Sequence, residues 1–291
     1  MERSRATEDR EAISLRTDDG WILRGERLRG PGPLVVCGHA MMVDRRTLDR
    51  PRGEGLASAL GAHGLEVAMI DARGHGESGP RAEQGGRWTY DEIVRRDVPA
   101  MVRWARSIAG GRKVVVIGHS LIGHASMIAA GLGGDVPDAI VGYAPNLWAP
   151  HLEPSAIARA AKSALLRAWM ASILPRGYFD ARALGMGTAA EAAPYVAQFA
   201  SMWARDRLAS PDGTIDYEAA LGRVAIPVLA FSSEGDRLLA RPAAVARFLG
   251  LMTQAPVEHR VVRELGHMGF VTDPRAREVW RDTCAWIDAL G

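Results

Sequence analysis

The chain has 291 residues, of which 47% are hydrophobic and 24% charged, a profile typical of a globular protein with a core that needs no disulfide or structural metal. Its 36 Lys and Arg residues are nearly balanced by 34 Asp and Glu residues, and a net charge of +2 without a separate basic run argues against nucleic-acid binding. The two cysteines, Cys37 and Cys284, exclude a disulfide framework, and both are predicted to be small buried apolar residues.

The sequence also bears on metals and membranes. No spacing of Cys and His matches a zinc site, so we expect no metal. No uncharged run of about 18 apolar residues is present, so we expect no membrane-spanning segment. The charged segment 1–16 lacks the apolar stretch of a signal peptide. We therefore expect a cytoplasmic protein that acts on a small molecule, with an oligomeric state that the sequence does not give.

Short apolar runs alternate with helical patterns through the first half of the chain. Asp19-Gly20 marks a hairpin turn between the first two runs. Strands are predicted at residues 12–15, 21–28, 34–37, 66–70, 113–117 and 139–143, and helices near residues 53–62 and over residues 91–108. This alternation predicts a mainly parallel sheet wrapped by helices and joined by right-handed crossovers.

The alternation stops between residues 144 and 223. Residues 155–173 and 190–205 have helical spacing, so we predict a helical cap without strands of its own over the carboxyl edge of the sheet. Two later strands and a terminal helix complete the core, at residues 227–231, 257–262 and 276–290. The predicted division is thus a core in two parts, 1–143 and 224–291, with a cap insertion at 144–223.

The sharpest local motif is Gly118-His119-Ser120-Leu121-Ile122-Gly123, which follows a buried strand and opens a helix. A tight turn between strand and helix strains the serine backbone and exposes its hydroxyl. Free N–H groups at the helix start can stabilise negative charge there. This context makes Ser120 a candidate nucleophile.

A serine hydroxyl at neutral pH needs a base that is oriented by an acid. Both follow in chain order, each after a predicted strand. Asp236 lies in the loop after residues 227–231, and His267 lies between glycines after residues 257–262. Glu234, two residues before Asp236, is the competing acid. We predict Ser120 as nucleophile, His267 as base and Asp236 as the acid.

With these motifs the chain resembles the α/β-hydrolase superfamily from about Trp21 to its C-terminus. It is similar to poorly characterised bacterial predicted hydrolases with a helical cap. The resemblance rests on the following segments: His39-Ala40-Met41, Asp71-Ala72-Arg73-Gly74-His75-Gly76-Glu77-Ser78, Gly118-His119-Ser120, Gly235-Asp236, Gly266-His267-Met268-Gly269 and, in the cap, Trp203-Ala204-Arg205.

The resemblance implies an α/β fold with a mostly parallel eight-stranded sheet flanked by helices and a helical cap after the sixth strand. It also implies an oxyanion hole formed by the backbone N–H groups of Leu121 and Met41. Two positions depart from the usual pattern beside this hole. Ala40 stands where glycine is usual, and Ile122 stands at the second small position of the serine motif.

Several other residues are candidates for a place in or beside the site. Asp71, Arg73 and His75 are predicted to tie their own loop, and His39, His119 and His124 to pack beside it. The side chains of Met41, Met42, Trp148, Trp169 and Trp203 are candidates for an acyl pocket. Packing between cap and core is the alternative, equal to the pocket for the two methionines and favoured for the tryptophans.

The sequence therefore predicts a serine hydrolase, without metal or cofactor, that cleaves a carboxylic ester of a small, partly hydrophobic substrate through an acyl-enzyme on Ser120. Two alternatives stay open. One is an acyltransferase with the same triad. The other is a catalytically impaired, ligand-binding member of the fold, which Ala40 and Ile122 would explain.

Overall fold

The computed structural model describes residues 10–291. Eight strands form one sheet in the order β1-β2-β4-β3-β5-β6-β9-β10. Their bounds are β1 (Arg10–Arg16), β2 (Ile22–Leu28), β3 (Leu34–Gly38), β4 (Glu66–Ile70), β5 (Val114–His119), β6 (Ala139–Tyr143), β9 (Val228–Ser233) and β10 (Val257–Val262). β2 pairs antiparallel with β1 and β4, and all other pairs are parallel. The predicted mostly parallel eight-stranded sheet is confirmed.

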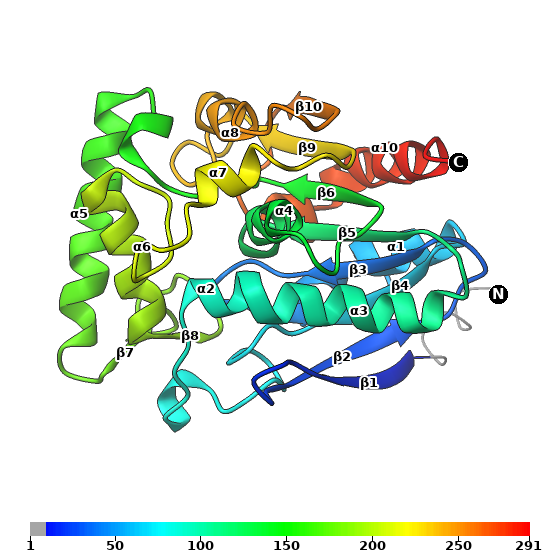
Figure 1. Ribbon diagram of the computed structural model, residues 1–291, viewed down its shortest axis with the longest axis horizontal. Coiled ribbons are helices and arrows are strands. Elements are labelled where there is room, and N and C mark those ends of the chain that lie inside the picture. Colours follow the sequence, from blue (N-terminus) through cyan, green and yellow to red (C-terminus); the bar gives the residue numbers. More distant parts are fainter. Residues whose placement is uncertain (1–9) are drawn as a thin grey trace.

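Helices flank this sheet (Figure 1). Their bounds are α1 (Leu56–Ala62), α2 (Tyr90–Glu92), α3 (Val98–Ala109), α4 (Leu121–Leu132), α5 (Ala156–Ile173), α6 (Ala193–Arg205), α7 (Tyr217–Leu221), α8 (Pro242–Leu249), α9 (Gly269–Thr272) and α10 (Arg277–Asp288). α3 and α4 lie on the near side of the sheet in Figure 1, and α1 lies on the far side. Because helices cover the sheet, all residues of the central strands β3, β5 and β6 are buried.

The helix predicted over residues 91–108 is interrupted. α2 and α3 are joined by a π-helical turn over Ile93–Asp97, and Pro99 stands at the start of α3. Proline has no N–H to donate to a preceding turn, so the regular helical bond pattern is broken next to it.

The segment between β6 and β9 carries α5 and α6, which stand together at one end of the molecule, at the left of Figure 1. It also contains an antiparallel pair of short strands, β7 (Tyr178–Asp180) and β8 (Ala190–Ala192). The expectation of a cap without strands was therefore wrong. Each strand has only three residues, which is too short to give a visible periodic pattern.

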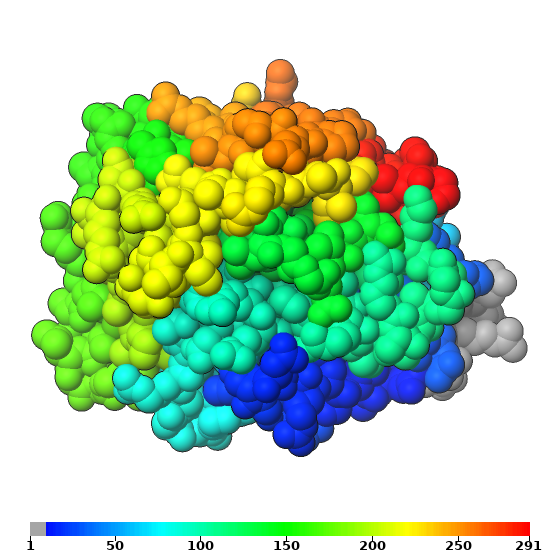
Figure 2. Space-filling model, viewed as in Figure 1, coloured from blue at the N-terminus to red at the C-terminus, as the bar shows by residue number. Residues whose placement is uncertain are grey.

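The cap segment lies directly on the core. Figure 2 shows its yellow-green residues against the cyan part of the chain. At this boundary the Asp91 amide donates to Gln198 of α6 (3.1 Å), and the Tyr217 hydroxyl donates to the Asp91 carboxylate (2.8 Å). α7 packs on α4 so closely that a Cβ on Gly131 would lie 1.8 Å from the Ala220 carbonyl oxygen.

Candidate active site

Ser120 occupies the turn between β5 and α4. Its backbone has φ 49° and ψ −102°, a conformation that costs a non-glycine residue energy and that clusters at functional sites. The surrounding fold holds it there, because the Ser120 amide donates to the Tyr143 carbonyl (2.8 Å). A Cβ on Gly118 would lie 2.2 Å from the Gly123 nitrogen, so the close approach of strand and helix requires glycine at position 118. This is the strained strand-to-helix turn that the motif predicts.

The departure at Ile122 has a packing explanation. A Cβ on Gly38 of β3 would lie 2.2 Å from Cγ2 of Ile122, so the isoleucine side chain fills space that this glycine leaves free. Ile122 is fully buried and does not line the cavity at Ser120. Gly123 instead supplies the small residue, since a Cβ there would lie 2.8 Å from the Gly118 carbonyl oxygen. The isoleucine is thus accommodated away from the site.

Asp236 and His267 are joined by a hydrogen bond. His267 Nδ1 donates to Asp236 Oδ2 at 2.6 Å, and the same carboxylate accepts from the amides of Leu239 (2.9 Å) and Ala240 (3.0 Å). Burial by itself would raise the pKa of the Asp236 carboxyl, but its bonds to His267 and to the two amides hold the pKa below its usual value. Glu234, the competing acid, is exposed to solvent.

Ser120 and His267 line one cavity of about 100 Å³. Within residues 10–291 the Ser120 hydroxyl takes part in no hydrogen bond, so hydroxyl and imidazole share the cavity without a direct bond in this conformation. Hydrogen bonds of this kind commonly close only when substrate binds. The Nδ1 bond to Asp236 leaves Nε2 of His267 as the nitrogen available to Ser120.

Other histidines support the site from behind. His119 Nε2 donates to the His267 carbonyl (2.9 Å), and burial lowers the pKa of His119 to about 3. His39 Nδ1 donates to the Ala40 carbonyl (2.7 Å), its Nε2 accepts from the Ala72 amide (3.0 Å), and burial lowers its pKa to about 4. Both are neutral side chains that hold loops, as predicted.

The cavity is mainly apolar. It is lined by Ala40, Met41, Met42, Val43, Ser120, His124, Asn146, Trp148, Trp169, Met186, Phe199, Leu239, His267 and Met268. Met41, Met42, Trp148 and Trp169 thus lie where the acyl-pocket hypothesis needs them. Trp203 does not line the cavity. Its Nε1 donates to the Ser163 hydroxyl (2.8 Å), and its ring lies edge-on to that of Trp148, with 6.4 Å between the ring centroids.

His124, which was predicted only to pack beside the loop, lines the cavity itself. It stands one helical turn after Ser120, and this spacing was the available signal. Burial lowers the pKa of His124 to about 3, so the ring is neutral. Its Nδ1 lies 2.7 Å from the Tyr90 hydroxyl. If the hydroxyl is the donor in this bond, Nε2 carries the ring hydrogen.

The motif at residues 71–78 is structural, as predicted, but its side chains tie the loop to other segments as well as to itself. The Asp71 carboxylate accepts from the amides of Arg45 (2.8 Å) and Glu77 (3.0 Å), and Arg73 pairs with the buried carboxylate of Asp97 (2.8 Å). None of these residues lines the Ser120 cavity.

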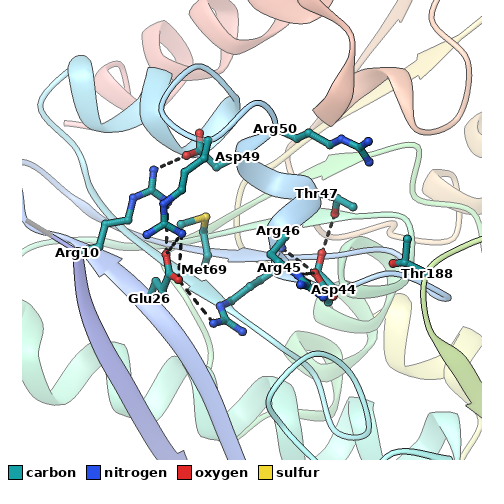
Figure 3. Close-up of a pocket in the computed structure, with 11 residues that line it drawn as sticks. Arg10, Glu26, Asp44, Arg45, Arg46, Thr47, Asp49, Arg50, Met69 and Thr188 are labelled. Carbon is teal, nitrogen blue, oxygen red and sulfur yellow. Dashed lines mark hydrogen bonds and ion pairs between the residues drawn. The ribbon is translucent and has the colours of Figure 1, made fainter. Parts of the chain in front are cut away.

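A second cavity, of about 420 Å³, lies beside β1 and is rich in arginine (Figure 3). Four of its five arginines are paired with neighbouring acids. Arg10 pairs with Asp49, and the Glu26 carboxylate lies within 3.4 Å of both Arg10 and Arg52. We interpret these pairs as ties that anchor β1, because paired arginines offer little charge to a ligand.

Residues 10–291 contain no group of three or more His, Cys, Asp or Glu side chains placed to hold a metal ion. No helix in this range combines the length and the apolar character needed to cross a bilayer.

Comparison with known proteins identifies relatives of this architecture. A family model described as serine aminopeptidase, S33, matches residues 49–274. An esterase of Pyrococcus furiosus superposes with a TM-score of 0.66 at 17% identity, covering 97% of this chain and 91% of the esterase. Est1E of Butyrivibrio proteoclasticus, solved with ferulic acid, gives a TM-score of 0.64 at 16% identity, with coverages of 96% and 98%. These matches confirm the α/β-hydrolase fold.

Curated proteins match over shorter stretches. Triacylglycerol lipase 2 of Arabidopsis thaliana is 30% identical over 157 residues, which is 47% of this chain and 37% of the lipase. Human lipase member N is 28% identical over 127 residues, covering 38% of this chain and 32% of that protein. The chain thus spans about a third of the length of the curated relatives that it matches.

Proposed function

Since this chain belongs to the serine aminopeptidase S33 family of α/β-hydrolases, we propose that it is a serine hydrolase that cleaves carboxylic esters of small, partly hydrophobic substrates. One observation carries the proposal. His267 is hydrogen-bonded to Asp236 at 2.6 Å and shares an apolar cavity with Ser120, which stands on a strained turn. A base fixed by an acid in the same cavity as a serine hydroxyl is the arrangement that activates serine.

In the proposed reaction the Ser120 hydroxyl oxygen attacks the ester carbonyl and gives its proton to His267 Nε2. Asp236 holds Nδ1 and stabilises the imidazolium that forms. The amides of Leu121 and Met41 stabilise the oxyanion, and the imidazolium then protonates the leaving alcohol. Water, activated by His267, releases the acyl group from Ser120.

The cavity bears on the substrate class. Thioethers and indoles, from Met41, Met42, Trp148 and Trp169, make up much of its wall. Such side chains adapt to apolar groups. The volume of about 100 Å³ is below the usual range of about 300–1,000 Å³ for ligand pockets, which favours a short acyl group.

The direct test is the variant Ser120→Ala assayed with p-nitrophenyl acetate and butyrate. We expect turnover to be lost while the circular dichroism spectrum and thermal unfolding stay native-like. Ser126→Ala is the matched control, because Ser126 lies in the same helix, bonds to the Ile122 carbonyl (2.6 Å) and does not line the cavity. Undiminished hydrolysis by Ser120→Ala would refute the proposal.

Two alternatives give different outcomes. An acyltransferase would form the same acyl-enzyme, but product would partition to an added alcohol in preference to water. A ligand-binding protein would leave Ser120 unlabelled by a fluorophosphonate. Ile122 is buried against Gly38, which gives a packing reason for one of the two sequence departures that suggested impaired catalysis.

A further inference from the structure

A buried glutamate of the cap reaches the loop that carries the proposed oxyanion donor. Glu191 lies in β8 and its side chain is fully buried. Glu191 Oε1 accepts a hydrogen bond from the Met42 amide at 2.6 Å and lies 3.0 Å from His75 Nε2. Met42 directly follows Met41, and both line the cavity at Ser120.

His75 is the cation that balances this carboxylate. Its Nδ1 lies 2.9 Å from the Arg73 carbonyl oxygen, and its Nε2 faces Glu191. Both ring nitrogens therefore face acceptors, and only the protonated ring can donate to both. Burial lowers the pKa of His75, but the Glu191 charge and hydrogen bond raise it to about 9. A charged pair joins cap and core at this point.

The backbone of the cap holds the same loop from its other side. The Met42 carbonyl accepts from the amides of Thr188 (2.7 Å) and Ala189 (2.8 Å). Gly187 makes this approach possible, because a Cβ there would lie 2.3 Å from the Met42 carbonyl oxygen. Met42 itself has φ 65°, a left-handed conformation that is strained for a non-glycine residue. The contacts of Glu191, Thr188 and Ala189 offset that strain.

From this arrangement we infer that Glu191 is a positioning residue for the oxyanion hole. By holding the Met42 amide, its carboxylate fixes the turn at residues 40–43 so that the preceding Met41 amide faces the oxyanion. The inference rests on the proposed hydrolase function and adds a role for the cap. This part of the cap acts on transition-state stabilisation, beyond enclosing the substrate.

The test separates positioning from simple attachment of the cap. Glu191→Ala removes the acceptor, whereas Glu191→Gln keeps an oxygen for the Met42 amide and loses the charge that pairs with His75. Arg182→Gln is the control, since Arg182 joins the cap to Glu83 of the core (3.0 Å) without touching the loop at residue 42. Thermal unfolding identifies any variant that fails to fold. If Glu191→Ala fails to fold, the isosteric Glu191→Gln still allows the kinetic comparison with the native protein.

Two readouts are needed, ester kinetics and binding of an alkyl trifluoromethyl ketone. Such a ketone forms a serine adduct that bears an oxyanion. Loss of a whole oxyanion donor costs about 10²–10³ in rate, so we expect a displaced donor in Glu191→Ala to lower kcat by about 10–100-fold. KM should change by less than about 3-fold, and ketone affinity should fall in parallel with kcat. The kcat and ketone affinity of Glu191→Gln should lie between those of Glu191→Ala and of the native protein. Those of Arg182→Gln should match the native values.

The outcomes distinguish this inference from the proposed function. If a fluorophosphonate labels the native protein and Glu191→Ala equally fast, with equal kcat, the inference is overturned alone. A rise in KM without a loss of kcat or of ketone affinity would also overturn it, because that result indicates substrate binding only. If the native protein itself is not labelled, the proposed function falls and this inference falls with it.

Discussion

Replacing His75 by glutamine should remove a pH-dependent part of the protein's stability. The imidazole is fully buried and faces three titratable groups, namely Glu191, Asp71 and His39. Of these, the Glu191 carboxylate is the main cause that raises the pKa of His75 from 6.5 to about 9. The folded protein therefore binds the His75 proton more tightly than the unfolded chain does.

The size of the effect follows from proton linkage. A difference of one pKa unit corresponds to 1.36 kcal/mol, so the change from 6.5 to about 9 corresponds to about 3 kcal/mol of unfolding free energy. Because the folded pKa is the higher one, this contribution is complete below about pH 6.5. It declines as the pH rises from about 6.5 to 9, and it is absent above that range.

The assay is reversible guanidinium unfolding of the native protein and His75→Gln at several pH values from 6 to 10, followed by tryptophan fluorescence. The difference in unfolding free energy between the two proteins should shrink by about 3 kcal/mol across this range. Glu191→Gln should show the same weakened pH dependence, because it removes the charge that holds the proton on His75. A difference between native protein and His75→Gln that stays constant with pH would refute the reasoning.

Two further predictions concern the triad and the packing beneath it. Asp236→Asn should lower kcat for p-nitrophenyl esters by about 10⁴-fold with little change in KM, since the amide would favour the wrong tautomer of His267; a loss below about 10-fold would contradict the assigned role. Gly38→Ala should destabilise the protein by about 1–3 kcal/mol, because the new methyl group collides with Ile122. Combining it with Ile122→Ala should relieve the collision. The double variant should therefore lose less unfolding free energy, measured in guanidinium, than the two single variants lose in sum, and additive losses would exclude the contact.

Much of the fold was predictable because its signals are local. The buried run at β5 and the alternation of strands with helical patterns follow from hydrophobic periodicity, and parallel strands bring their carboxyl ends to one edge. Ser120, Asp236 and His267 each follow a strand, so their meeting at that edge could be expected. The structure brings Asp236 and His267 into hydrogen-bond contact and places Ser120 in the same cavity.

The parts that were not predicted depend on contacts between distant residues. Met42 and Glu191 are 149 positions apart, and β8, which carries Glu191, has only three residues. The usual glycine of the serine motif is replaced because Gly38, on another strand, makes room for Ile122. The place of Trp203 behind Trp148 depends in the same way on its bond to Ser163 of α5. No local pattern carries these pairings.

Residues 187–191 contact Met42 directly, whereas the other described parts of the insertion form no hydrogen bond to it. The insertion therefore has one part whose sequence is constrained by the loop at residue 42 and another part that is free of this constraint. α5 makes no bond to Met42 among the described residues, so a change in α5 can reshape the cavity at Ser120 through Trp169 without removing a contact of that loop. A chimera that exchanges α5 but keeps its buried face should therefore leave the loop at residue 42 in place. A chimera that also replaces residues 187–191 has to bring its own acceptor for the amide of residue 42.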